Sequence, residues 1–513
     1  MDYLDYVQMT IGQRFVYKLK SFFLGIPNAI VKLVSIIGHF FASVFRTIAN
    51  GFKGYGSRFK YGDMGTKLSY VVMGAGNFVH KQIGKGILFL ASEIAYIIFM
   101  FSFGAKYISK IYCNGVDIEG QLVNGVIGSE GPIYGADTSG LGLTGGNVII
   151  NGDTLDNSNK ILLFFVLTVM VTIAFFAIYI ANTKSAYAAQ KVVESGKEPV
   201  GTLEELKSFL DERFHVTLMA IPVLLLLIFT VLPIIFTIFV AFTNYDKNHQ
   251  PPGNLYWWVG FENFADVFYT NKMKSETFGK ILLWTIVWAI FATFTNYILG
   301  IVLALMINKK GIKFKSFWRT MFVITAAVPQ FVTLLVMRIL LDDKGAINGM
   351  LGTHIPFLTD MSGVWPKITV ILVNMWVGIP YTMLISSGLL MNIPEDLYES
   401  ARIDGANAFQ QFTKITFPYI FFVTTPYLIT SFVGNINNFN VIYFLTAGGP
   451  NSDSYYQAGQ TDLLVTWLYK LTVNSSDFNL AAVIGLLVFV ICAAGSLITF
   501  NMSKASKNEE EFS

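Results

Sequence analysis

Eight long runs of apolar residues alternate with polar segments along the chain. Each run approaches the roughly 20 residues that an α-helix needs to cross a lipid bilayer. The runs occupy residues 87–105, 161–181, 218–242, 281–307, 318–341, 368–391, 419–445 and 480–500. The pattern therefore predicts an all-α, polytopic membrane protein with about eight transmembrane helices.

The same pattern divides the chain into four regions. They are an interfacial N-terminal region (1–86), two membrane helices with their loops (87–217), a core of six membrane helices (218–501) and a tail (502–513). The second region contains a Gly-rich loop at 106–160, for which a small subdomain and a mobile flap are both open interpretations. It also contains a loop at 182–216, where Thr202 and Glu205 have the spacing of a helix capping box.

Lysine and arginine are unevenly distributed between the two sides of the predicted membrane. With the N-terminus inside, the inner segments hold 25 of these residues and the outer segments hold 10. The densest inner segment is NKKGIKFKSFWR at 308–319. Because positive loops are retained on the cytoplasmic side, both termini are predicted to be cytoplasmic and the loop at 106–160 extracellular.

Polar residues also recur every three or four positions between residues 28 and 50. They are Asn28, Lys32, Ser35, His39, Ser43, Arg46 and Asn50. This spacing places them on one face of an amphipathic helix. Two cations and a histidine on that face favour a helix on the membrane surface, with a ninth spanning helix as the alternative.

Composition excludes several other classes of protein. The 513 residues are 53% hydrophobic and 13% charged, and the net charge is only +3. This balance is unlike the clustered basic surface of a nucleic-acid-binding protein. The two cysteines, Cys113 and Cys492, lack the spacing of a metal site or a disulfide framework. The N-terminus lacks the compact apolar core of a removable signal peptide, and no cofactor, metal site or catalytic group is predicted.

The segment between the sixth and seventh apolar runs has a pattern of its own. It reads IPEDLYESARIDGANAFQQFTKITFP over residues 393–418. Pro394 followed by two acidic residues is typical of the first turn of a helix. Gly405 predicts a turn, and the apolar spacing predicts a second helix over 407–417. A helix, turn and helix on an inner loop favours contact with a partner protein.

Within this segment, eight positions match the coupling-loop signature of permeases of binding-protein-dependent ABC importers. They are Glu399, Ala401, Asp404, Gly405, Ala406, Phe412, Ile415 and Pro418, with Ser400 where the signature has alanine. The chain thus resembles this family, which implies the type I importer permease fold and a separate, homodimeric nucleotide-binding ATPase that receives the segment. Packing of Phe412 and Ile415 within the chain itself is the alternative. The chain has no G-x-x-x-x-G-K-[ST] phosphate loop, so it is not expected to bind ATP.

The sixth and seventh apolar runs contain neutral polar residues and no charged ones. The polar residues are Asn374, Tyr381, Ser386, Ser387, Thr430, Ser431, Asn435, Asn437, Asn438 and Asn440. Amides, hydroxyls and aromatic rings suit an uncharged, hydroxyl-rich solute. The alternative, that they join helices to one another, is favoured for Ser386 and Ser387 and stays open for the asparagines. Glu93 and Arg338, in other runs, are interpreted as structural or snorkelling charges.

Three stretches resemble the larger permease subunit of maltose transporters, and the similarity extends over 218–501. They are WVGFENF at 258–264, NMWVGIPY at 374–381 and SFVGNINNFNVIYFLTAGGP at 431–450. By position, the resemblance implies a sugar-contacting set of Asn374, Val377, Gly378, Tyr381, Ser431, Gly434, Asn435 and Asn438. Gly434 stands where the maltose permeases have an aromatic ring, which implies a wider cavity or a different sugar.

The resemblance also implies the function and the partners. The chain would not be an enzyme but one half of a heterodimeric permease in the cell membrane, surrounded by lipid. It would import maltose or maltodextrin-type oligosaccharides by ATP-driven alternating access, supplied by an extracellular binding protein. The short segment at 244–280 resembles permeases of single-membrane bacteria, whose binding protein is usually a tethered lipoprotein. A secondary carrier would need an intramembrane ionisable site, and a membrane enzyme would need clustered catalytic groups; the sequence indicates neither.

Overall fold

The structure is a computed structural model of the chain. It describes residues 49–113, 158–201, 207–250 and 258–502 except Lys310, together with short stretches between 35 and 47 and within 116–154, and single positions at 204 and 256. The chain forms two compact units. The N-terminal unit contains Ile37–Asn263 and Asp477–Ala482, and the C-terminal unit contains Phe264–Ser476 and Val483–Ser513.

Among the described residues, seven helices are long and apolar enough to cross a membrane, and one bent helix pair makes an eighth. The prediction of an all-α membrane protein with about eight spans is therefore confirmed. The predicted region boundaries, including the start of the core at residue 218, stay a prediction. The helix at Phe214–Val240, which contains that residue, groups with the N-terminal unit.

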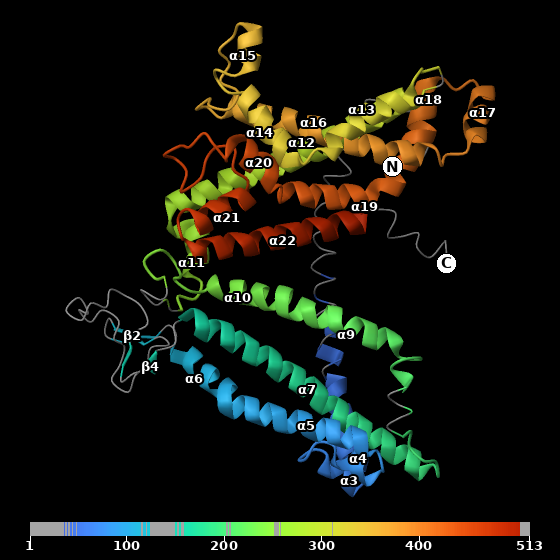
Figure 1. Cartoon of the computed structure of the whole chain (residues 1–513), viewed down its shortest axis with the longest axis vertical. Coiled ribbons are helices and arrows are strands. Elements are labelled where there is room, and N and C mark those ends of the chain that lie inside the picture. Colours follow the sequence, from blue (N-terminus) through green and yellow to red (C-terminus); the bar gives the residue numbers. More distant parts are fainter. Residues whose placement is uncertain are drawn as a thin grey trace. The chain divides into compact units, whose positions relative to one another are not determined.

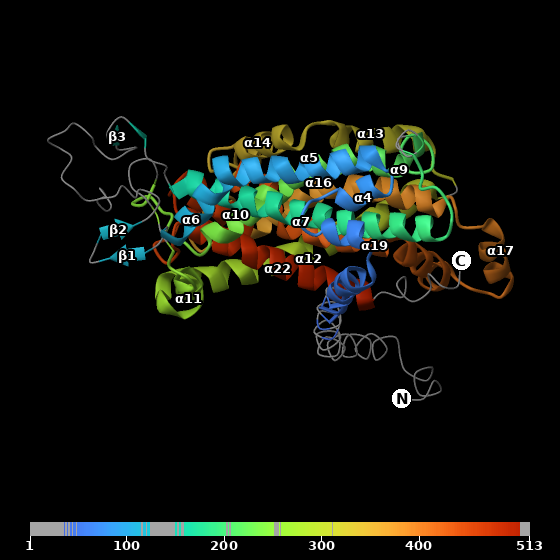
Figure 2. The same cartoon turned by 90° about the horizontal axis from the view of Figure 1, so that it is seen from below.

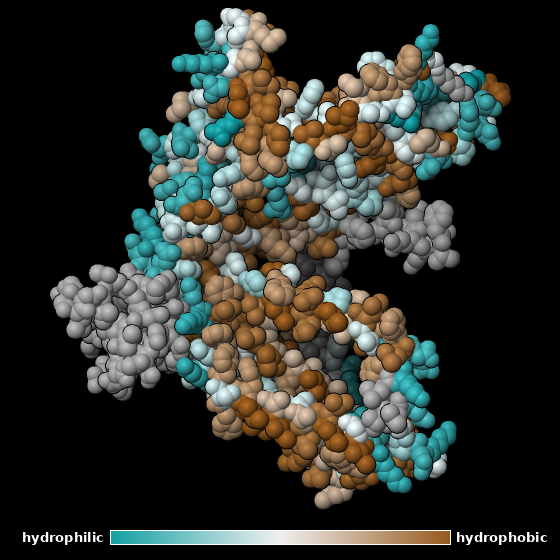
Figure 3. Space-filling view, viewed as in Figure 1, coloured by the Kyte–Doolittle hydropathy of each residue, from teal (hydrophilic) through white to brown (hydrophobic). Residues whose placement is uncertain are grey.

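Three membrane segments form the N-terminal unit (Figure 1). They are α5 (Ile83–Phe99) continued by η1 (Met100–Gly104) and α6 (Ala105–Cys113), α7 (Ser158–Glu194), and α9 (Phe214–Leu226) continued by η3 (Leu227–Val231) and α10 (Leu232–Val240). Apolar side chains cover the visible face over these long helices, and polar side chains gather near their ends (Figure 3). A lipid-facing surface of this kind explains the long uninterrupted apolar runs of the sequence.

Two short helices, α3 (Met64–Leu68) and α4 (Ala75–Val79), fold against α7 in this unit. Asn182 of α7 accepts a hydrogen bond from the Gly74 amide at 2.9 Å and donates one to the Ser69 carbonyl at 2.9 Å. Glu93 accepts a hydrogen bond from the Met73 amide at 2.8 Å, so its carboxylate has a structural contact, as interpreted from the sequence.

The loop between α6 and α7 contains two antiparallel hairpins. One pairs β1 (Val116–Ile118) with β2 (Gln121–Val123), and the other pairs β3 (Ile149–Ile150) with β4 (Asp153–Thr154). The rest of 114–157 lies outside the described residues, as do the capping box at Thr202 and Glu205 and most of the predicted amphipathic helix at 28–50. These three predictions therefore stay predictions.

The C-terminal unit contains the remaining helices. In chain order they are η4 (Asp266–Thr270), α12 (Lys272–Asn308), α13 (Lys315–Ala327), α14 (Gln330–Leu340), α15 (Ala346–Leu351), α16 (Val364–Leu390), α17 (Glu395–Ile403), α18 (Ala408–Gln411), η5 (Phe412–Thr416), α19 (Phe417–Ile436), α20 (Phe439–Thr446), α21 (Leu464–Val473) and most of α22 (Phe478–Met502); the short α11 (Glu262–Ala265) lies at the boundary. Figures 1 and 2 both place α17 at one end of this unit's long helices.

Two membrane segments of this unit are interrupted. The fifth, predicted as one helix over 318–341, is instead the pair α13 and α14, bent by 83°. Proline lacks an amide hydrogen and disfavours a helical residue before it, which explains the extended backbone at Val328, the residue before Pro329. The seventh segment is interrupted between α19 and α20, where the Asn438 side chain accepts a hydrogen bond from the Val441 amide at 3.2 Å.

The core of the C-terminal unit lies around α12. One cluster of buried side chains joins Trp288 of α12 to Leu334 of α14, Val370 of α16 and Ile442 of α20. A second cluster, about two and a half to three and a half turns further along α12, joins Tyr297 and Ile301 to two residues of α19. These clusters hold both half-helices, α14 and α20, against the central α12.

Candidate functional site

A cavity of about 450 Å³ lies within the C-terminal unit. Helices α12, α13, α14, α16 and α19 line it, together with the two interruptions described above. Its lining residues are Ala292, Thr293, Asn296, Tyr297, Thr325, Ala327, Val328, Pro329, Gln330, Thr333, Asn374, Val377, Gly378, Tyr381, Thr382, Tyr427, Leu428, Ser431, Asn435 and Asn438. None of these described residues is charged, so the cavity suits a neutral ligand.

Most of the sugar-contacting set predicted by resemblance lies at this cavity. Four members come from α16, which reaches the cavity over slightly more than two turns from Asn374 to Tyr381. Pro380 lies inside this stretch and removes one hydrogen bond from the helix interior. Three further members, Ser431, Asn435 and Asn438, come from α19 and the residue that caps α20.

Gly434 is the member that does not line the cavity. It is exposed on α19, and a Cβ added there would meet no atom within 4 Å. A larger side chain therefore has room at this position.

The asparagines of the seventh segment contact neighbouring helices as well as the cavity. Asn435 Nδ2 donates to Thr293 Oγ1 of α12 at 2.9 Å, and Asn438 Nδ2 donates to Asn435 Oδ1 at 3.3 Å. The Trp288 indole donates to the Asn435 carbonyl at 3.0 Å. The same amides therefore join helices and line the cavity, and their contact with a sugar stays a prediction.

Two other side-chain amides at the cavity each have a polar atom that takes no part in such hydrogen bonds. Asn374 Nδ2 and Asn296 Oδ1 are buried and have no hydrogen-bond partner among the described residues. One is a donor and the other an acceptor, so a hydroxyl-bearing ligand could satisfy both.

Sequence reasoning missed several lining residues, including Asn296, Gln330 and Tyr427. For Asn296 a signal exists, because it is the only Asn or Gln within the apolar run 281–307. Gln330 follows the break at Pro329, and its Oε1 accepts a hydrogen bond from Asn440 Nδ2 at 3.3 Å. Tyr427 faces Tyr381 with ring centroids 6.2 Å apart.

The other predicted site is the turn between α17 and α18. The Gly405 amide donates to the Arg402 carbonyl at 3.1 Å, and the Ala406 amide donates to the Ala401 carbonyl at 2.8 Å. This pair of bonds is the Schellman motif that ends a helix, and Gly405 has the required positive φ of 77°. The second of these hydrogen bonds, which spans more residues, joins Ala406 to Ala401, and both of these signature alanines are half-buried.

Exposure within this segment differs from the sequence expectation. Phe412 and Ile415, expected on the face presented to a partner, are half-buried, and Phe412 packs on the chain's own cluster of Tyr297, Ile301 and Ile420. Because η5 continues directly into α19, Phe412 faces the unit's core rather than solvent. The most exposed large apolar side chains of the segment are instead Ile403 (86%) and Phe409 (63%).

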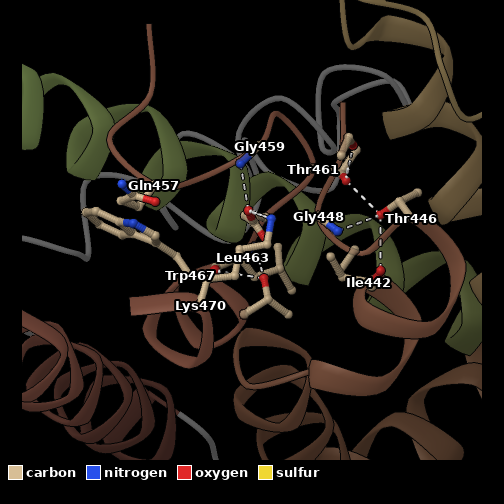
Figure 4. Close-up of polar contacts among 12 residues, drawn as sticks. Ile442, Thr446, Gly448, Gln457, Gly459, Thr461, Leu463, Trp467 and Lys470 are labelled. Atoms are coloured by element: carbon tan, nitrogen blue, oxygen red, sulfur yellow. Dashed lines mark hydrogen bonds and ion pairs between the residues drawn. The ribbon is translucent and has the colours of Figure 1, made fainter. Parts of the chain in front are cut away.

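A buried ion pair fixes the loop that follows α20. Asp462 is fully buried and accepts hydrogen bonds from Lys470 Nζ at 2.6 Å and from the Gly459 amide at 2.7 Å (Figure 4). A Cβ at Gly448 would lie 1.9 Å from Asp462 Oδ1, so glycine is required there. Burial raises the pKa of the Asp462 carboxyl, while the Lys470 ammonium opposes this shift. The pair joins the end of this loop to α21, and Gly448, just after α20, lies against its carboxylate.

Long apolar helices around a neutral polar cavity define a multi-pass membrane protein with an internal polar cavity. Residues 296–506 match the family model described as binding-protein-dependent transport system inner membrane component. The chain is 36% identical over 446 residues to the galactooligosaccharides transport system permease protein GanP of Bacillus subtilis, covering 86% of this chain and 97% of the relative.

Other relatives are also named as permease proteins of sugar transport systems. The maltodextrin transport system permease protein MdxF of Bacillus subtilis is 34% identical over 452 residues, covering 86% of this chain and 95% of that protein. Among solved structures, a bacterial ABC transporter involved in alginate import has 22% identity and a TM-score of 0.47, covering 59% of this chain and 98% of that one. The chain belongs to the family of permease subunits of binding-protein-dependent sugar transport systems, and it is not itself an enzyme.

Proposed function

We propose that the cavity of the C-terminal unit binds a maltodextrin-type oligosaccharide during import. The observation that carries this proposal is the lining itself, in which amides, hydroxyls and three tyrosine rings occur without a charged side chain. Neutral donors and acceptors match sugar hydroxyls, and the ring pair Tyr381 and Tyr427 offers apolar faces for a pyranose. The volume of about 450 Å³ lies in the range of small-molecule sites.

The turn between α17 and α18 is the proposed docking site for a separate, homodimeric ATPase. Its exposed apolar side chains, Ile403 and Phe409, stand beside the acidic Glu399 and Asp404, which are also exposed. Apolar anchors with a charged rim are typical of protein interfaces. In this proposal Glu399, Ala401, Asp404, Gly405, Ala406 and Pro418 shape the segment, while Phe412 and Ile415 fix it to α19.

The remaining parts of the proposal concern the assembly and its orientation. A second permease completes the translocation path as a heterodimer, and an extracellular binding protein delivers the sugar. Both termini lie in the cytoplasm, as the distribution of positive residues favours. ATP binding by the partner then drives alternating access of the cavity.

A co-purification experiment tests this assembly. The tagged chain is purified in mild detergent from its native membrane, and the accompanying proteins are identified by mass spectrometry. A second permease and an ATPase are expected. Purification of the chain alone, together with ATP-independent maltotriose uptake in vesicles, would contradict the proposal.

A galacto-oligosaccharide is the second candidate substrate, because the relative GanP, 36% identical to this chain, is named for that class. Uptake of maltotriose and of a β-1,4-linked galactotriose by the same vesicles distinguishes the two. Preference for the galactotriose would replace the maltodextrin assignment while leaving the permease role unchanged.

A further inference from the structure

Helices α12 and α16 interlock through two reciprocal contacts beside the cavity. A Cβ at Gly378 of α16 would lie 2.1 Å from Asn296 Nδ2 of α12. One turn further along, a Cβ at Gly300 of α12 would lie 2.6 Å from Thr382 Cβ of α16. Each glycine therefore makes room for one side chain of the facing helix.

The two side chains accommodated in this way both line the cavity. Thr382 Oγ1 lies 3.4 Å from the Tyr427 hydroxyl and 3.4 Å from the Gly378 carbonyl, so Thr382 is placed to orient Tyr427. Asn296 Oδ1, in contrast, is buried without a hydrogen-bond partner among the described residues. A buried acceptor without a partner costs free energy unless a ligand or water pairs with it.

Neighbouring polar groups do not satisfy Asn296. Thr293, one turn away on α12, accepts the Asn435 amide. Tyr297 shares a hydrogen bond of 2.6 Å with Thr424. The nearest amide on α16, Asn374, lies one turn before Gly378 and presents an unpartnered donor, Nδ2. Asn296 and Asn374 thus offer an acceptor and a donor from two walls of one cavity.

We propose that Asn296 is a specificity-determining residue that accepts a hydrogen bond from a sugar hydroxyl, and that Gly378 acts by making room for it. This inference rests on the proposed function of the cavity. It assigns Gly378 an indirect role, in place of the direct sugar contact that the resemblance implied. A site built to pair with a hydroxyl discriminates strongly against ligands that lack it or hold it in another orientation.

The first experiment compares Asn296→Leu with Thr295→Val in the full importer, reconstituted with its binding protein in vesicles. Thr295 is the matched control, because among the described residues its hydroxyl bonds only to the Phe291 carbonyl of its own helix, at 2.6 Å, and it does not line the cavity. Maltotriose uptake by the leucine variant is expected to fall roughly tenfold or more. Uptake by the control, and ATP hydrolysis stimulated by the binding protein in both variants, should stay within about twofold of the unmodified importer.

The second experiment tests the role of Gly378 with a double-mutant cycle. Gly378→Ala should lower maltotriose uptake because the added methyl group displaces the Asn296 amide, and Asn296→Ala should lower it because the amide is removed. Their combination should be no worse than the more severe single variant by more than about twofold, since the displaced group is then absent. If the fold-losses of uptake in the two single variants multiplied in the double variant, the assignment of Gly378 would be overturned.

The outcomes also separate this inference from the proposed function. Maltotriose import by the unmodified complex supports the proposed function whatever the variants do. Uptake by Asn296→Leu within twofold of the unmodified complex would overturn the role of Asn296 alone. An equal fall of uptake and of stimulated ATP hydrolysis would also overturn it, because a structural defect lowers both. A changed ratio of maltotriose to galactotriose uptake, with hydrolysis preserved, is the expected signature of specificity.

Discussion

Replacing Gly405 should uncouple ATP hydrolysis from transport without removing the protein from the membrane. Gly405 occupies the position after the helix end in the Schellman motif of α17 and has a φ of 77°. It is exposed, and a Cβ added there would meet no atom within 4 Å. The cost of a substitution is therefore conformational rather than steric, and it stays local to the turn.

The magnitude follows from that geometry. An L-residue in the left-handed region costs about 1–2 kcal/mol, and a β-branched residue lies at or above the upper end of this range. A free-energy change of 1–2 kcal/mol corresponds to roughly a 5- to 30-fold loss in the population of the native turn. Asparagine visits the left-handed region more readily, so Gly405→Asn should cost well under half as much as Gly405→Val.

The assay measures sugar uptake and ATP hydrolysis on the same reconstituted vesicles. For Gly405→Val we expect uptake to fall roughly 5- to 30-fold while the amount of protein in the membrane is unchanged. Gly405→Asn should retain most of the uptake. Normal uptake by the valine variant, or an equal loss in both variants, would refute the argument from the turn conformation.

Three other predictions concern exposed and buried positions of the C-terminal unit. Ile403→Asp, at a side chain that is 86% exposed, should reduce co-purification of the ATPase without changing membrane abundance, which a pull-down from solubilised membranes measures. Lys470→Met should destabilise the protein by about 3–5 kcal/mol because it leaves the buried Asp462 carboxylate unpaired, and Asp462→Asn in the same chain should restore part of the thermal stability. Without the ammonium the pKa of Asp462 rises further, so the melting temperature of Lys470→Met should fall as pH rises through that pKa. Gly434→Phe should fold normally, since its Cβ has open space, and should leave uptake of maltose and of maltoheptaose within about twofold in a transport assay, because Gly434 does not line the cavity.

The turn segment shows what local sequence could predict. Pro394 and the acidic residues after it begin α17, and Gly405 ends it, because these effects depend only on a few neighbouring residues. The burial of Phe412 could not be predicted in the same way. Its neighbours Tyr297 and Ile301 lie more than a hundred residues earlier in the chain, and only the packing of α19 on α12 brings them together.

The interrupted fifth segment shows a different limit. Hydropathy is continuous across 318–341, so an average over a window predicts one helix. The signal that decides the backbone is the single dipeptide Val328-Pro329, whose effect is conformational and leaves the mean hydropathy almost unchanged. Asn438 is comparable, because the same amide that suggested a sugar contact also caps α20.

Asn296 could be recognised as a site residue only from the tertiary structure, for another reason. The sequence presents it as one amide in a long apolar run, and a polar residue in such a run commonly joins two helices. Only the close approach of α12 to α16 at Gly378, and the lack of a partner for Oδ1, separate it from that ordinary role. Both facts depend on residues about 80 positions away in the chain.

The cavity and the turn segment are connected through the same two helices. Helix α16 carries Tyr381 at the cavity and ends at Leu390, about 13 Å further along at 1.5 Å per residue, just before α17 begins. The return path, from α18 through η5 into α19, has no break before Asn437 and carries Tyr427. The Tyr398 hydroxyl of α17 lies 2.8 Å from Thr416 Oγ1, and this hydrogen bond joins α17 to the end of η5. Because packed helices move as rigid elements, we expect a partner that moves α17 to shift Tyr381 and Tyr427 at the cavity as well.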